Sequence, residues 1–138
     1  GSAAALPVGA PLQDDVCISV RTKLDVATVA ARMDTACPAN KFGILHVHDV
    51  TATLAKKGVE LGRECLLYEI CNPHIAKGLM DVQMASVTFL PCRVAIYKEE
   101  GEREDGRTTV VAAMRPSQIP GLFHDDKLAE PSATAEAS

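Results

Sequence analysis

The chain has 138 residues, 47% of them apolar, so it is long enough to bury the core of a single domain. Its net charge is −4, and its lysines and arginines are scattered rather than clustered, which argues against a nucleic-acid partner. No apolar run approaches the roughly 18–20 residues that cross a bilayer, so no membrane partner is expected either.

The two ends of the chain are predicted to lie outside the folded domain. Residues 1–13 are mostly small residues and prolines without periodicity, and they begin with Gly-Ser, which is typical of what tag removal leaves. Residues 124–138 contain too few apolar side chains to offset the entropy lost on ordering. The sequence therefore predicts a flexible arm over 1–13, one domain over 14–123 and a disordered or extended tail over 124–138.

The first half of the domain alternates short strands with helices. Alternating apolar residues predict a strand over 16–20, and the stretch 25–38 starts with an aspartate N-cap, has helical apolar spacing and ends at a proline. A second strand is predicted over 42–49, followed by a short helix over 50–57 that is closed by a glycine. A third strand is predicted over 63–71.

The second half begins with a helix-start signal and ends with a hairpin. Asn72 and Pro73 suit the cap and the first position of a helix, so a helix of one or two turns is expected over 74–80. The apolar run 86–97 contains a proline, which predicts an approach segment followed by a strand. A charged turn then leads to a return strand over 107–114.

These elements predict an α+β fold: a mixed, mostly antiparallel sheet of about five strands with two or three helices packed on one face. No glycine-rich phosphate loop occurs, which argues against a doubly wound nucleotide-binding fold. The other face of such a sheet would be wide and uncovered. We expect a second copy of the chain to bury it, giving a homodimer.

The chain has an odd number of cysteines, set in apolar runs and without a Cys-x-x-Cys pair. They are Cys17, Cys37, Cys65, Cys71 and Cys92. This pattern is typical of free, buried thiols in the reducing cytoplasm, although one disulfide stays possible. A cytoplasmic location is expected, or a periplasmic one if a signal peptide has been removed.

Two histidines lie close together in the second predicted strand. Because side chains alternate along a strand, His46 and His48 should share one face, about 6.6 Å apart along the chain. Two imidazoles on one face are a candidate ligand site for a metal or haem iron. Zinc would need further ligands, such as Cys65 or Cys71 from the neighbouring strand. The alternative is a polar, half-buried face of an edge strand.

Three segments of the sequence carry a family resemblance. They are Phe42-Gly43-Ile44-Leu45-His46-Val47-His48-Asp49, Glu69-Ile70-Cys71-Asn72-Pro73 and Leu90-Pro91-Cys92-Arg93-Val94. In this order and spacing the chain, over about residues 16–115, resembles the domain-of-unknown-function 302 family. The resemblance implies a small bacterial α+β protein that forms dimers, has no assigned catalytic residues and, in some members, binds haem. His46 and His48 stand where other members carry other residues.

The function predicted from this resemblance is non-covalent binding of haem b, in a carrier, gas sensor or redox partner with a histidine axial ligand. There is no Cys-x-x-Cys-His, so covalent attachment is excluded. The candidate axial donors, which are also the metal candidates, are His46, His48 and His74. The other candidates are Met80 and Met84 as weak second ligands, Phe42, Phe89, Phe123, Leu45 and Val47 as walls, and Arg93 or Lys41 near a propionate.

The alternative function is a non-enzymatic homodimeric module that binds a small apolar ligand or a protein without haem. In that case His74 is only a structural residue in the first turn of a helix. No nucleophile motif and no paired acid and base occur in the sequence, so no catalytic residue is predicted. An enzyme is the less expected outcome.

Overall fold

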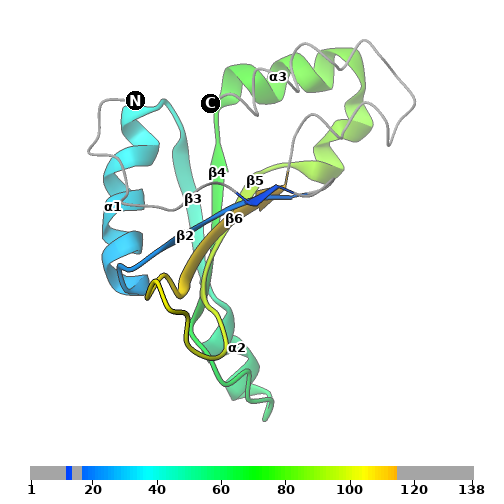
Figure 1. The fold of residues 1–138 in the computed structure, drawn as a ribbon. Coiled ribbons are helices and arrows are strands. Elements are labelled where there is room, and N and C mark those ends of the chain that lie inside the picture. Colours follow the sequence, from blue (N-terminus) through cyan, green and yellow to red (C-terminus); the bar gives the residue numbers. More distant parts are fainter. Residues whose placement is uncertain (1–11, 14–16, 115–138) are drawn as a thin grey trace.

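The computed structural model describes residues 12–13 and 17–114. Their strands form one sheet in the order β1-β2-β6-β5-β4-β3, and every described ladder is antiparallel (Figure 1). The elements are β1 (Leu12–Gln13), β2 (Cys17–Thr22), α1 (Val26–Ala39), β3 (Gly43–Asp49), α2 (Val50–Lys56), β4 (Cys65–Cys71), α3 (Pro73–Val82), the 3-10 helix η1 (Met84–Phe89), β5 (Cys92–Lys98) and β6 (Thr109–Met114). The predicted α+β class is confirmed.

The helices begin where the sequence predicts caps. The Asp25 carboxylate accepts a hydrogen bond of 2.8 Å from the Thr28 amide at the start of α1. α1 runs through Pro38 to Ala39, one residue further than predicted. Proline removes one N–H donor there, but the amide of Asn40 still closes the last turn onto the Ala36 carbonyl at 3.1 Å.

The Asn72-Pro73 signal also predicted a helix start correctly. The Asn72 side chain accepts hydrogen bonds from the amides of His74 and Ile75, at 3.0 and 3.2 Å, and Pro73 is the first residue of α3. α3 continues to Val82, so it is longer than expected. After the Gln83 cap, η1 continues the chain to β5, so the predicted approach segment is largely helical.

One face of the sheet is covered by α1, and we call it the first face. Tyr68 and Ile96 on this face are buried together with Val26 and Val29 of α1. The Tyr68 hydroxyl donates hydrogen bonds to α1. It lies 3.2 Å from the Ala30 carbonyl oxygen and 3.3 Å from Oδ1 of Asp34. The main core therefore lies between α1 and the central strands.

The opposite face, which we call the second face, has smaller side chains at its centre. Leu67, Ala95 and Ala112 are direct cross-strand neighbours on β4, β5 and β6. All three are half-buried, and neither hydrophobic core cluster of the described residues contains them. The second face is thus the less densely packed side of the sheet.

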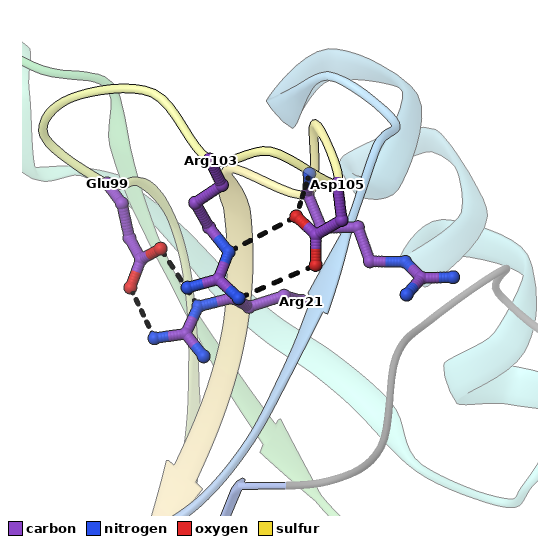
Figure 2. Close-up of polar contacts among 5 residues, drawn as sticks. Arg21, Glu99, Arg103 and Asp105 are labelled. Carbon is purple, nitrogen blue, oxygen red and sulfur yellow. Dashed lines mark hydrogen bonds and ion pairs between the residues drawn. The ribbon is translucent and has the colours of Figure 1, made fainter.

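The predicted charged hairpin joins β5 to β6. Figure 2 shows two ion pairs there: Arg21 of β2 with Glu99, and Arg103 with Asp105 within the turn. The Asp105 carboxylate also accepts a hydrogen bond from the Arg107 amide at 3.0 Å. Glu99, Arg103 and Asp105 therefore have partners inside the hairpin or on β2.

The predicted arm and tail fall mostly outside the described residues. Leu12–Gln13 lie within the predicted arm, yet they form β1 and pair with β2 at Ser19 and Ile18. The rest of the arm, the tail over 124–138 and the candidate wall residue Phe123 lie outside the described part of the chain. None of the described helices is both long enough and apolar enough to span a membrane.

Candidate functional site

A pocket of about 380 Å³ lies at the end of the sheet where β4 ends and β5 begins. It is bounded by the last turn of α1 on one side and by α3 and η1 on another. In Figure 1, α3 and the last turn of α1 lie at the upper end of the molecule. Its lining residues are Ile18, Ala36, Cys37, Asn40, Phe42, Ile70, Leu79, Thr88, Phe89, Leu90, Pro91, Cys92, Arg93, Val94, Ala113 and Met114. Most of these side chains are apolar.

The wall formed by α3 and η1 is held in place by a small second core. Leu79 of α3 is 1% exposed and packs against Phe89, Leu90 and Met114. The hydroxyl of Ser86, which is fully buried in η1, lies 3.5 Å from the Leu79 carbonyl and donates to it. α3 and η1 therefore form one unit across the end of the sheet.

Two cysteine thiols contribute to the pocket. Cys37 is buried in the last turn of α1, and Cys92 is the first residue of β5. Burial raises the pKa of both thiols, because the charged thiolate is poorly solvated there. Both are therefore neutral at physiological pH and add to the apolar character of the wall.

The polar side chains of the lining differ in how they are bonded. The Asn40 amide donates to the Ala36 carbonyl at 2.8 Å, and the Thr88 hydroxyl donates to the Ala85 carbonyl at 2.8 Å. Arg93 is exposed and forms no ion pair with any residue in the described part of the chain. Of the described residues that line the pocket, it is the one with a formal charge.

The strand histidines share a face, as predicted, but they lie away from the pocket. The ring centroids of His46 and His48 are 6.2 Å apart, and their cross-strand neighbours are Glu69 and Leu67 of the second face. His48 Nε2 lies 2.8 Å from the hydroxyl of Thr53 in α2. β3 is the last strand of the sheet and is bulged just before His46, so the pair occupies a sheet edge.

The structure brings only some of the predicted site residues together. Phe42, Phe89 and Arg93 line the pocket. The candidates that do not line it are His46, His48, His74, Met80, Met84, Leu45, Val47 and Lys41. Among these, His74 is exposed in the first turn of α3, and Met84 and Leu45 are 64% and 61% exposed.

The sequence alone did not indicate that Cys37, Leu79 and Met114 line a pocket. Each comes from a different element, and the fold alone brings them to one end of the sheet. The sequence around Pro91 and at the end of α1 is apolar, which predicts that these residues are buried. It does not predict that a pocket remains between them.

The described residues contain no group of three or more histidine, cysteine, aspartate or glutamate side chains placed to hold a metal ion. Cys65 and Cys71 lie at opposite ends of β4, and none of the cysteines in the described part of the chain forms a disulfide. The zinc prediction therefore rests on His46 and His48 as its paired donors.

Comparison with known proteins agrees with the fold. The crystal structure of an uncharacterized conserved protein DUF302 from Bacillus stearothermophilus superposes with a TM-score of 0.80. The two chains are 25% identical, and the alignment covers 90% of this chain and 92% of that one. A comparison with curated proteins gives no match. The family described as domain of unknown function DUF302 matches residues 18–138, which is most of the chain, so this protein belongs to the DUF302 family.

Proposed function

We propose that the protein is a non-enzymatic binding module that holds a small apolar ligand in the pocket between α1, η1 and the end of the sheet. The observation that carries this proposal is the pocket itself, with its volume of about 380 Å³ and its largely apolar lining. Small-molecule sites are concave and mostly apolar, with volumes of roughly 300–1,000 Å³, so this pocket suits a ligand at the small end of that range.

The chemistry of the lining favours binding over catalysis. The thiols of Cys37 and Cys92 have raised pKa values, so they are poor nucleophiles in the free protein. Among the described residues that line the pocket there is no histidine, aspartate or glutamate, so they offer none of the usual general acids or bases. What the pocket supplies is a water-excluding surface.

Filling the pocket tests this proposal. Ala36→Phe places a ring in the pocket from α1, whereas Ala31→Phe makes the same change on the exposed side of the same helix. We expect 1-decanol to bind the wild type and Ala31→Phe with equal affinity by titration calorimetry, and Ala36→Phe to bind it weakly or not at all. Circular dichroism checks that both variants fold.

Two results would overturn the proposal. One is a wild-type protein that binds no apolar probe. The other is an Ala36→Phe variant that folds and binds 1-decanol as tightly as the Ala31→Phe control, because the ligand would then lie elsewhere.

Haem b binding stays a prediction, and its candidate site is the pair His46 and His48 on β3 rather than the pocket. The observation that favours it is the close pairing of His46 and His48 at the edge of the second face. We expect a Soret band after hemin titration that is lost in His46→Ala, His48→Ala or His74→Ala, and that shifts with carbon monoxide if one axial position is exchangeable. A spectrum that stays flat during hemin titration would exclude this function.

We also propose that a second copy of the chain packs on the second face. The row Leu67, Ala95 and Ala112 supports it, because its side chains are apolar and half-buried and the two alanines allow a second sheet to approach closely. Sedimentation equilibrium should give a dimer for the wild type and a monomer for Ala95→Glu, which places a charge at the centre of this face. A monomeric wild type would contradict the proposal.

A further inference from the structure

The apolar pocket lies at the point where the chain leaves the sheet. β6 ends at Met114, which packs against Leu79 of α3, and both residues line the pocket. β6 is an inner strand between β2 and β5, and Pro116 has no N–H to donate to a further position of a ladder. The sequence therefore predicts that the chain leaves the sheet close to the pocket lining.

Part of the pocket floor stays open on the side where the chain leaves. Val94, Ala113 and Ile18 are direct neighbours across β5, β6 and β2, and all three line the pocket from the first face. α1 buries Tyr68, which is the β4 member of the same cross-strand row, whereas these three residues are only half-buried. The described elements therefore leave apolar surface uncovered beside the end of β6.

The residues after Met114 carry a compact set of apolar side chains. Residues 115–123 have the sequence Arg-Pro-Ser-Gln-Ile-Pro-Gly-Leu-Phe, and the polar run 124–127 follows. Proline followed by glycine suits the two central positions of a type II turn, which brings the flanking residues Ile119 and Leu122 within about 7 Å of each other. The sequence thus predicts that Ile119, Leu122 and Phe123 form one apolar cluster on a short tether.

We propose that residues 115–123 fold back onto the first face and place Ile119, Leu122 and Phe123 in the pocket, and that an external apolar ligand binds by displacing them. The competition with a ligand rests on the proposed function, whereas the docking does not. Nine extended residues span up to about 30 Å, so the whole cluster can reach the pocket from Met114. A short tether gives an effective concentration on the order of millimolar, so weak contacts suffice to fill the pocket.

The chemistry of the lining fits this occupant. The thiols of Cys37 and Cys92 are neutral because burial raises their pKa, and the side chains of Asn40 and Thr88 donate to backbone carbonyls. Apolar side chains can therefore enter without leaving these groups unpaired. The charged groups of the run 124–127 would lose their hydration in such a pocket, so the inserted segment ends at Phe123.

A tryptophan reporter tests the docking, because the chain has no tryptophan of its own. In Phe123→Trp we expect blue-shifted indole emission without ligand, and a shift to the red as 1-decanol displaces the segment. Leu128→Trp, beyond the polar run, is the matched control and should emit as a solvent-exposed indole under both conditions. Circular dichroism checks that both variants fold.

Two results of this experiment would overturn the docking. One is solvent-exposed emission from a folded Phe123→Trp variant. The other is a blue shift that disappears on dilution, because the segment would then occupy the pocket of a second copy of the chain.

Shortening the inserted side chains tests the competition by titration calorimetry. Phe123→Ser and, independently, Ile119→Ser should bind 1-decanol about tenfold more tightly than the wild type, because less apolar surface has to leave the pocket. Leu128→Ser should bind it as the wild type does. Without ligand, iodoacetamide should alkylate Cys92 about tenfold faster in Phe123→Ser than in the wild type. Alkylation of Cys65, at the other end of β4, should stay unchanged.

The outcomes separate this inference from the function it rests on. If Phe123→Ser binds 1-decanol more weakly than the wild type, Phe123 is a wall of the ligand site, and the competition is wrong while the function of the pocket stands. If neither protein binds 1-decanol, the proposed function is wrong, and blue-shifted emission from Phe123→Trp still supports the docking. Equal affinities and equal alkylation of Cys92 in Phe123→Ser, Ile119→Ser and the wild type would overturn the whole inference.

Discussion

The guanidinium of Arg21 and the carboxylate of Glu99 form a two-pronged ion pair, with Nε 2.9 Å from Oε2 and Nη2 2.8 Å from Oε1 (Figure 2). The two residues are 78 positions apart in the sequence, so the pair joins β2 to the residue that follows β5. Both side chains are 23% exposed. A pair with this geometry and partial burial should contribute more than an ordinary surface pair.

Replacing Glu99 by glutamine should lower the free energy of unfolding by about 1 kcal/mol, because the Arg21 guanidinium loses its charged partner. Urea denaturation measures the change. Asp81→Asn is the matched control: its pair with Lys77 is largely exposed, so we expect a loss below about 0.5 kcal/mol. Equal losses in both variants would show that the geometry of the Arg21 pair adds nothing.

The same pair should make stability depend on pH. The hydrogen bonds from Arg21 lower the pKa of Glu99 below its ordinary value of 4.5. A carboxyl whose pKa is lower in the folded state stabilises the fold above its unfolded pKa and loses that effect as pH falls through the folded pKa. The stability difference between wild type and Glu99→Gln should therefore be full at neutral pH and shrink below about pH 4.5.

Asn72 should be the most sensitive local position in α3. Asn72→Ala removes the acceptor for the amides of His74 and Ile75, and we expect a loss of about 1 kcal/mol in the free energy of unfolding. Asn72→Asp keeps a capping acceptor and should retain most of the stability. Because α3 forms one wall of the pocket, Asn72→Ala should also weaken the binding of 1-decanol, whereas an unchanged affinity would show that the wall survives the loss of its cap.

Tyr68 should make the protein sensitive to alkali. Burial, with the nearby Asp34 carboxylate, raises the pKa of Tyr68 from 10.0 to about 12. The unfolded chain then loses this proton first, so the stabilisation is complete below pH 10 and is lost as pH rises towards 12. The free energy of unfolding should fall over this range in the wild type and much less in Tyr68→Phe, as measured by urea denaturation at stepped pH.

The thiols of the pocket should react slowly in the native state. Each unit by which burial raises the pKa of Cys37 or Cys92 lowers the thiolate fraction about tenfold. Alkylation with iodoacetamide, followed by mass spectrometry, should therefore label both residues far more slowly in the native protein than in urea. Bound 1-decanol should slow Cys92 further, and fast native labelling of Cys92 would show that the pocket is open to water.

The parts of the fold that depend on local sequence were predicted well. Asp25 and Asn72 act through hydrogen bonds to amides two or three residues away, and Gly58 closes α2 with a positive φ of 77°. The shared face of His46 and His48 follows from strand alternation alone. These features need only a few neighbouring residues, so the sequence carries them directly.

The pocket could not be predicted in the same way. Cys37, Cys92 and Met114 meet there only because α1 packs on the first face, and because the start of β5 and the end of β6 lie next to α3 and η1. His46 and His48 have the chemistry of metal or haem ligands, yet they lie on β3, which is the edge strand of the sheet, away from the pocket. Chemical character is visible in a sequence, whereas a gap left between packed elements is not.

The bulge in β3 bears on how the protein avoids fibrous assembly. β3 is an edge strand of the sheet, and its residues Leu45 and Val47 are 61% and 40% exposed. An edge strand with exposed apolar residues can pair with a strand from another molecule. The break in register between Ile44 and His46 interrupts the regular spacing that such a template requires. We therefore expect the bulge next to His46 to oppose amyloid-like addition of strands at this edge.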